Sequence, residues 1–553
     1  MRIPFLIAII LPAAFVCMSA QTKAPDNWFN LDPKENNVNG VSSDRVYNEL
    51  LKNKKSQTVI VAVIDGGVDV NHEDLKAIIW TNPKEIPGNG IDDDGNGFID
   101  DVHGWNFIGG KDGKNVNHET LEKTRVYASL RTKYANADSS KLKGKSLVEY
   151  KKYSKLKTEI QNELSEAQES LGQVENTRTI IMNALDALSA KLGEKAITKE
   201  NLDAIKDGND QMVNVGKNLM MRLMASGQDV SSIKAVKENL MGQIQEEADH
   251  FETKVKYQLN PDYDSRKLIV KDNYADSKEH FYGNADCAGP DPMHGTHVAG
   301  IIGAVRDNNL GIKGVADNVR IMSVRCVPDG DERDKDVANA IIYAVDNGAS
   351  VINMSFGKGQ SWDKATVDRA VKYARDHDVL LVHAAGNEGV NTNGFSNNYP
   401  NSKFEKAGCF AKKTASNWIE VGALSWQKGE DEVATFSNYG DKIVDVFSPG
   451  VDLKSTVPGN KYRDLSGTSM ASPVTAGVAA MLRSYFPELT AEQVKECIEK
   501  SVIKQDFKVK KPGSDELVPF STLSRTGGIV SAYEAVKIAQ QMHGKKKLSA
   551  PKA

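Results

Sequence analysis

The feature that most constrains the fold is an apolar, mostly β-branched run from Thr58 to Ile64, followed at once by Asp65. A strand that is apolar at almost every position has to be buried on both faces, as in a parallel sheet covered by helices. Polar side chains at the carboxyl ends of such strands lie where open α/β sheets place their sites. The run therefore predicts an α/β core with Asp65 at its functional edge.

The alternation of strands and helices continues along the chain. We predict strands at 320–325, 350–354 and 379–385, and helices at 43–51, 335–347, 362–376, 490–501 and 531–541. Strands that alternate with helices are joined by crossovers that align them in parallel. The predicted fold class is α/β, with a mostly parallel central sheet between two layers of helices.

One long segment, residues 115–260, breaks this alternation. Glycine becomes rare there, and apolar residues recur at three- and four-residue steps, which is typical of an amphipathic helix or a coiled-coil seam. The members of this seam are Tyr153, Leu156, Ile160, Leu164, Ala167, Leu171 and Val174. Further helical stretches follow near 199–224 and 230–251. We predict a helical hairpin or small bundle inserted into the α/β domain, with its apolar stripe used for packing and its charges solvated.

The first residues predict export. Arg2 is followed by an apolar run and then by the small pair Ser19 and Ala20, which is the pattern of a secretory signal over residues 1–20. Bulky residues precede Cys17, so we do not expect lipidation. We therefore expect a periplasmic, cell-surface or extracellular protein, and the sequence does not choose among these compartments.

Composition excludes several classes of partner. A formal net charge of −4 without a long basic stripe argues against nucleic-acid binding. No segment after the leader predicts a membrane span, and we expect a monomer. Four of the five cysteines follow the leader, too few for a disulfide framework, and the sequence does not say whether any of them pair.

An acidic loop, residues 89–101, predicts a calcium site. Oxygen-bearing side chains alternate before Gly97, as in the first half of an EF-hand loop, although His103 stands where an EF-hand has its bidentate glutamate. Asp, Asn and Gly also form plain acidic turns, but so many carboxylates repel one another without a cation. The predicted ligands of structural Ca²⁺ are Asp92, Asp94, Asn96, the Phe98 carbonyl, and Asp101.

Four positions that are well separated in the sequence are predicted to be catalytic. Ser469 lies among small residues at the start of the helix that follows Gly467, where the helix N-terminus favours developing negative charge. His294 precedes a small-residue helix, and Asn387 follows the strand at 379–385. Together with Asp65 they supply a nucleophile, a base, an acid that orients the base, and an amide donor for an oxyanion.

These blocks, in this order, resemble the subtilisin-like serine proteases (subtilases). The similarity covers the Asp65 strand with residues 72–75, the segment 294–300, the segment 467–473, and the stretches 434–440 and 447–451. The resemblance implies a subtilisin-like fold and a peptidase that forms an acyl-enzyme with polypeptide substrates. It also implies that Ser355, Phe356 and Gly357 pair with an extended peptide.

The resemblance assigns a role to each of the four residues. Ser469 attacks the scissile carbonyl, His294 acts as base and then as acid, and Asp65 orients the imidazole. Asn387 and the Ser469 N–H bind the oxyanion. We interpret His297 and His72 as packed structural residues. The implied organisation is 1–20 signal, 21–56 N-terminal segment, 57–114 and 261–543 catalytic domain, 115–260 insertion, and 544–553 basic tail.

Three features depart from the family pattern. Asp65 is followed by two glycines where many members have Ser-Gly, which we take as harmless. The region before Asp65 is too short for the usual inhibitory propeptide. The insertion separates the acid from the base, so its helices are expected to overhang the cleft and to limit substrate access.

Two alternatives to a general secreted endopeptidase stay open. One is a catalytically silent relative that binds peptides and uses the insertion to recognise a partner. The other is an active protease dedicated to processing one partner. The sequence fixes neither the cleavage specificity nor the physiological substrate.

Overall fold

The computed structural model describes residues 23–546 except 207, 229, 395–397 and 407–411. The predicted signal at residues 1–20, Cys409, and most of the predicted basic tail lie outside the described residues. No helix among the described residues is long and apolar enough to cross a membrane. The three cysteines described, Cys287, Cys326 and Cys497, are buried and unpaired.

A nine-stranded sheet in the order β10-β13-β7-β6-β5-β4-β1-β3-β2 forms the centre of the α/β body. Its pairings are parallel except for β10 with β13. The strands are β1 (Val59–Asp65), β2 (Gly104–Asn106), β3 (Val319–Arg325), β4 (Val351–Met354), β5 (Leu380–Ala384), β6 (Trp418–Leu424), β7 (Val446–Pro449), β10 (Ile503–Lys504) and β13 (Gly528–Ile529). The predicted α/β fold with a mostly parallel sheet is confirmed.

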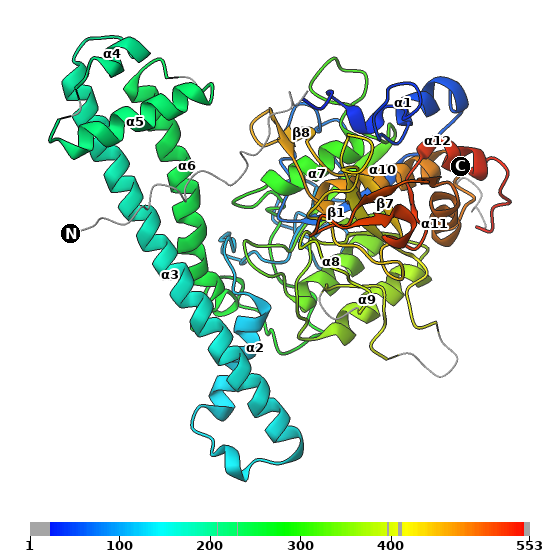
Figure 1. Cartoon of the computed structure of the whole chain (residues 1–553). Helices are drawn as coiled ribbons and strands as arrows, with labels where there is room; N and C mark the ends of the chain where they lie inside the picture. Colours follow the sequence, from blue (N-terminus) through cyan, green and yellow to red (C-terminus); the bar gives the residue numbers. More distant parts are fainter. Residues whose placement is uncertain (1–22, 207, 229, 395–397, 407–411, 547–553) are drawn as a thin grey trace.

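Helices cover both faces of this sheet (Figure 1). On one face lie α7 (Met293–Gly303), α10 (Thr468–Tyr485), α11 (Ala491–Lys500) and α12 (Ala532–Ala539), and on the other α8 (Asp334–Asp346) and α9 (Lys364–Asp376). Strand β1 shows why its run is continuously apolar. Val61 and Val63 belong to the core of the first face, whereas Ala62 and Ile64 belong to the core of the second.

Smaller elements complete the body. The N-terminal segment contains a short helix α1 (Ser43–Arg45) that continues through Val46–Leu50, and it buries Trp28 and Phe29 in the first core. Two antiparallel hairpins, β8 (Leu453–Val457) with β9 (Lys461–Leu465) and β11 (Lys508–Lys510) with β12 (Leu517–Pro519), lie outside the main sheet.

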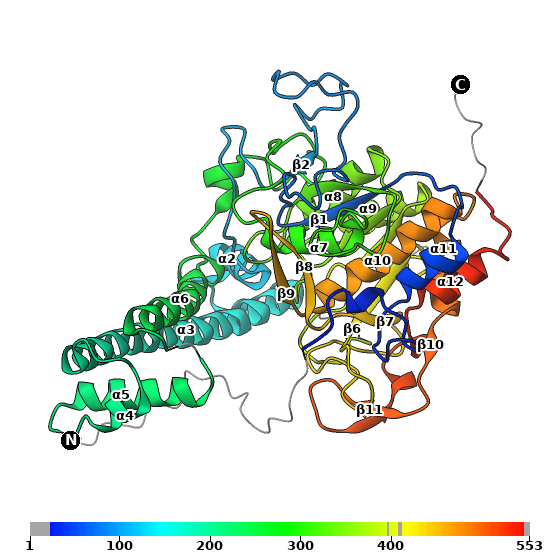
Figure 2. The same cartoon turned by 90° about the horizontal axis from the view of Figure 1, so that it is seen from above.

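Within the segment between β2 and α7, a run of α-helices forms a projection, which we call the insertion. It comprises α2 (Glu122–Tyr134), the 49-residue α3 (Gly144–Leu192), α4 (Lys199–Asp203), α5 (Gln211–Ala225) and α6 (Ile233–Thr253). Figure 1 and Figure 2 show α3 to α6 extending away from the α/β body, with α4 and α5 at the far end. Apolar clusters join α3 to α2 near the body and to α4, α5 and α6 beyond it.

Helix α7 and strand β8 approach closely where the fold has to place the site. The hydroxyls of Ser455 and Thr456 each donate to an α7 carbonyl, of His297 and Thr296, at 2.7 Å. A Cβ at Gly300 would overlap with both of these hydroxyl oxygens. Glycine therefore allows β8 to seat the helix that carries His294.

We predict that Gly300→Ala destabilises the protein by about 1–3 kcal/mol, because the added methyl group overpacks the contact between α7 and β8. The measurement is the free energy of unfolding in urea, in a Ser469→Ala background that prevents self-digestion. Gly172→Ala is the matched control. A Cβ at Gly172 in α3 meets no described atom within 4 Å, so the same substitution should stabilise by about 0.4–1 kcal/mol. Equal effects of the two variants would contradict the packing argument.

Candidate active site

The carboxyl end of β1 and the first turn of α7 bring an acid and an imidazole together. Asp65 is the last residue of β1, and both of its carboxylate oxygens lie 2.9 Å from Nδ1 of His294. Gly66 N–H also donates to the Asp65 carboxylate, at 2.7 Å. The Asp65 side chain is 3 % exposed and the His294 side chain 38 %. The carboxylate thus fixes the ring through Nδ1, while part of the imidazole stays exposed.

The same contact sets the basicity of the ring. Burial lowers the pKa of His294, but the charge of Asp65 and its hydrogen bond raise it more, with a further contribution from Asp291. The net shift of the His294 pKa is upward. This shift makes the imidazole a better proton acceptor than a free histidine.

Ser469 lies in the first turn of α10, next to the end of β4. Its hydroxyl donates to the carbonyl of Ser355 at 3.1 Å, and the Ser355 hydroxyl donates to the carbonyl of Ser469 at 2.9 Å. In this conformation the Ser469 hydroxyl therefore points to Ser355 rather than to His294. Hydrogen bonds between nucleophile and base are often loose without substrate, and a χ1 rotation redirects a serine hydroxyl.

Asn387 is held by its side-chain carbonyl. Its Oδ1 accepts from the Thr468 N–H at 2.9 Å and from the Thr468 hydroxyl at 3.0 Å. This assignment of the amide leaves Nδ2 without a hydrogen-bond partner among the described residues. A Cβ placed on Gly467 would lie 3.6 Å from both Asn387 Nδ2 and the Ser469 N–H. Two donors thus converge on one small space beside a glycine, as binding of an oxyanion requires.

The predicted binding segment follows β4 directly. Ser355 is buried, Phe356 is half-buried and Gly357 is exposed. The two reciprocal bonds between Ser355 and Ser469 fix this segment against the first turn of α10.

The two other histidines singled out in the sequence are bonded to backbone atoms. His297 is buried, and its Nε2 lies 3.0 Å from the carbonyls of both Leu453 and Arg463. Burial lowers the pKa of His297 to about 4. His72 is also buried, with Nε2 3.1 Å from the Lys461 carbonyl. Both histidines connect the α/β body to the β8–β9 hairpin.

The acidic loop brings together only part of the predicted ligand set. Carboxylate oxygens of Glu85, Asp92 and Asp94 lie within 4.8 Å of one another. Asp101 instead accepts hydrogen bonds from Asn82, Asn96 and Tyr343, at 2.9, 3.1 and 2.7 Å. Burial raises the pKa of Asp101 to about 6, and the nearby charge of Asp94 contributes less.

Glu85 is the member of this cluster that the sequence analysis missed. Its Oε1 accepts from the N–H groups of Asp93 and Asp94, whereas its buried Oε2 has no hydrogen-bond partner among the described residues. An unpaired buried carboxylate oxygen facing two more carboxylates is a donor set that suits a hard cation such as Ca²⁺. Glu85 lies before the loop with no regular spacing to it, so the motif gave no signal for this residue.

Comparisons with known proteins identify the family of this chain. The profile of the subtilase family (Peptidase S8) matches residues 56–522. The chain is 46 % identical over 199 residues to a thermophilic serine proteinase from Bacillus sp. (strain AK1), which covers 35 % of this chain and 44 % of that protein. It is 38 % identical over 205 residues to subtilisin DY from Bacillus licheniformis, covering 36 % of this chain and 67 % of that protein.

The chain spans about half the length of the first curated relatives that it matches. Among solved structures, it is similar to a protease from Pseudoalteromonas arctica PAMC 21717, with 27 % identity, a TM-score of 0.37, and 46 % and 78 % of the two chains covered. A cold-adapted subtilisin-like serine proteinase is 31 % identical, with a TM-score of 0.33 and coverage of 42 % and 76 %. Since the family profile spans most of the sequence, the chain belongs to the subtilase family.

Proposed function

We propose that this protein is an exported serine endopeptidase that hydrolyses peptide bonds through Asp65, His294 and Ser469. The single observation that carries the proposal is the buried Asp65 carboxylate, with both oxygens 2.9 Å from His294 Nδ1. A carboxylate in this position holds the imidazole in the tautomer whose Nε2 accepts a proton.

The proposed reaction proceeds through an acyl-enzyme. His294 Nε2 takes the hydroxyl proton as Ser469 Oγ attacks the scissile carbonyl, and the imidazolium then donates this proton to the leaving amine. Water attacks the resulting ester with His294 again as base, which releases the acid product and restores the serine. Asp65 stabilises the imidazolium in both steps without itself taking the proton.

The oxyanion of each tetrahedral intermediate is proposed to lie between Asn387 Nδ2 and the Ser469 N–H. A side-chain donor of this kind lowers the barrier by about 2.7–4 kcal/mol. Segment 355–357 is proposed to align the substrate by pairing with its extended backbone. No residue type needed for catalysis is replaced in this chain, which favours an active enzyme over a silent peptide-binding relative.

We further propose a structural Ca²⁺ held by Glu85, Asp92 and Asp94, with Asn96, the Phe98 carbonyl and Asp101 as the remaining candidates from the loop. The ion would neutralise the mutual repulsion of these carboxylates and stabilise the loop. The chain organisation also stays a proposal: a leader at 1–20, a catalytic domain at 57–114 and 261–543, and an inserted helical unit at 115–260.

We predict that Ser469→Ala lowers hydrolysis of a denatured protein by at least about a thousandfold, because the nucleophile is lost. Ser466→Ala, which removes an exposed hydroxyl three residues earlier, should keep full activity. A serine-reactive phosphonate should label the parent chain at Ser469. Labelling without hydrolysis of unrelated proteins would indicate a dedicated processing protease. Unchanged hydrolysis by Ser469→Ala would contradict the assignment.

We predict that kcat/KM rises with pH through a midpoint above the ordinary imidazole pKa of about 6.5. The neutral imidazole is the base, and Asp65 raises the pKa of His294, so the inactive imidazolium persists to higher pH. Asp291→Asn removes a smaller raising contribution, and its midpoint should move to lower pH. Asp93→Asn, in the acidic loop, is the matched control and should not move it. A midpoint at or below about 6.5 in the parent chain would contradict the predicted direction.

We predict that calcium stabilises the fold by about 2–3 kcal/mol at a concentration about a hundred times its Kd. Glu85→Gln should remove most of this gain, because it takes away a carboxylate of the cluster. Asp93→Asn is the matched control, since the Asp93 carboxylate accepts from Ile86 N–H and Asn89 in the same loop. The measurement is the melting temperature with calcium and with a chelator, in the Ser469→Ala background. If the Ser469→Ala chain with an unchanged acidic loop melts at the same temperature with calcium and with chelator, the metal site is excluded.

A further inference from the structure

A buried lysine follows the proposed binding segment at once. The Lys358 side chain is 1 % exposed, and its Nζ donates to Glu122 at 2.8 Å and to the Glu332 carbonyl at 2.7 Å. The Asp334 carboxylate lies 2.8 Å from the same nitrogen. Removing an ammonium group from water is costly unless acceptors surround it. These acceptors therefore determine where Lys358 lies.

The acceptors come from two different parts of the chain. Glu122 begins α2, the first helix of the insertion, whereas Asp334 begins α8 of the α/β body. Both carboxylates are almost completely buried, at 1 % and 4 % exposure. Burial raises the pKa of Glu122, but the charges of Arg125 and Lys358 lower it by more, so that the net pKa of Glu122 is about 2. The Glu122 carboxylate is thus kept ionised beside the lysine.

Arg125, one turn further along α2, completes this group. Its guanidinium contacts Glu122 at 2.6 Å and donates to the carbonyls of Asp331 and Glu332 at 3.0 and 3.1 Å. In return, the Asp331 carboxylate accepts from the Glu122 N–H at 2.7 Å. We call Lys358, Glu122, Asp334 and Arg125 the Lys358 cluster. It joins the insertion to the loop after β3 and to the segment after β4.

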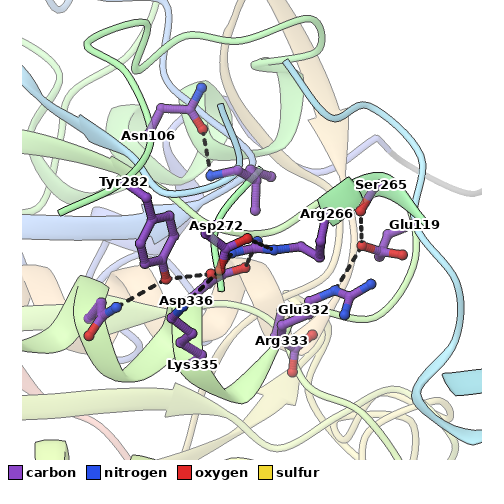
Figure 3. A network of polar contacts seen from close by, with 12 residues as sticks. Asn106, Glu119, Ser265, Arg266, Asp272, Tyr282, Glu332, Arg333, Lys335 and Asp336 are labelled. Carbon is purple, nitrogen blue, oxygen red and sulfur yellow. Dashed lines mark hydrogen bonds and ion pairs between the residues drawn. The ribbon is translucent and has the colours of Figure 1, made fainter. Parts of the chain in front are cut away.

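A second ionic link holds the two ends of the insertion at the same place. Figure 3 shows Glu119 between Arg333 and Ser265. Arg333 Nε donates to Glu119 at 2.9 Å, and the Ser265 hydroxyl donates to the same carboxylate oxygen. Glu119 precedes α2 and Ser265 follows α6, so the chain enters and leaves the insertion through one buried polar junction.

The contacts then continue from Lys358 to the proposed nucleophile. Ser355 lies three residues before Lys358, and reciprocal hydrogen bonds join Ser355 to Ser469. The backbone of Lys358 also pairs with that of Tyr399 at 2.9 Å in both directions. Segment 355–357 is thus held at one end by Ser469 and at the other by a side chain that the insertion binds.

We infer that Lys358 is a positioning residue: through the Lys358 cluster, helix α2 of the insertion fixes segment 355–357 in the geometry that an extended peptide needs. The insertion then belongs to the substrate-binding apparatus, although most of it projects away from the α/β body. This inference rests on the proposed function, because it needs segment 355–357 to bind substrate.

The test compares Lys358→Met with Lys335→Met. Lys335 is a close match: it is 3 % exposed and contacts two carboxylates, Asp272 and Glu279, and one backbone carbonyl, that of Asn273. The substrates are a peptide with four residues before the cut and a single-residue ester. For Lys358→Met we expect kcat/KM for the peptide to fall by about tenfold to a hundredfold, mainly through KM. We expect little change for the ester, and little change of either substrate in Lys335→Met.

A second variant guards against misfolding. Glu122→Gln keeps the shape of the side chain and removes only the charge that the insertion contributes, so it should raise the peptide KM in the same direction. Melting temperatures establish that each variant is folded. Equal effects on peptide and ester, or equal effects of Lys358→Met and Lys335→Met, would overturn the inference.

Phosphonate labelling distinguishes a failure of the proposed function from a failure of the inference about Lys358. If the parent chain is not labelled at Ser469, the proposed function fails and the inference fails with it. If the parent chain is labelled but both cluster variants keep its peptide KM, the inference alone fails.

Discussion

The parallel alignment of β1, β3, β4 and β5 is the constraint on which the rest of the structure depends. Parallel strands end at one edge of the sheet, and both faces of this sheet are covered by helices. Functional polar side chains therefore lie at the carboxyl ends of the strands. Asp65 ends β1, Ser355 follows β4, and Asn387 follows β5 closely. Three positions far apart in sequence therefore lie at the same edge of the sheet, because each follows the carboxyl end of a parallel strand.

The helices then add what the strands do not supply. Helix α7 presents His294 to Asp65, and α10 presents Ser469 beside Ser355. Thr468, the first residue of α10, also orients the Asn387 amide through two hydrogen bonds. One helix start thus carries the proposed nucleophile, one oxyanion donor, and the group that aims the second donor. Such preorganisation avoids reorientation of dipoles during the reaction.

Much of this arrangement could be predicted from local patterns. The apolar run at 58–64 gave β1, and the small-residue runs after His294 and Ser469 gave α7 and α10, because each pattern records burial directly. Strands β2 and β6, helix α2 and the β8–β9 hairpin were not predicted. Their sequences lack a strong period, and their partners are set by tertiary pairing.

The same limit applies to residues whose role depends on distant partners. Glu85 joins Asp92 and Asp94 only once the chain folds back on itself. Lys358 was not singled out in the sequence, yet it is buried against a carboxylate 236 positions earlier. A lysine carries no local signal of burial, since its partners can come from anywhere in the chain.

Buried charge also distinguishes the base of the insertion from its far end. Beyond the body, α3 to α6 hold together through apolar clusters such as that of Leu185, Leu188 and Met220. At the junction with the body, buried ion pairs join the two parts, among them Glu122 with Lys358 and Glu119 with Arg333. Packed apolar side chains often stabilise such a site as well as a buried ion pair does. What the ion pairs add is direction, because each hydrogen bond accepts only a narrow range of positions. A junction whose only role was to attach the insertion to the body would not need hydrogen bonds of defined direction. A junction that also positions the neighbouring segment 355–357 would need them.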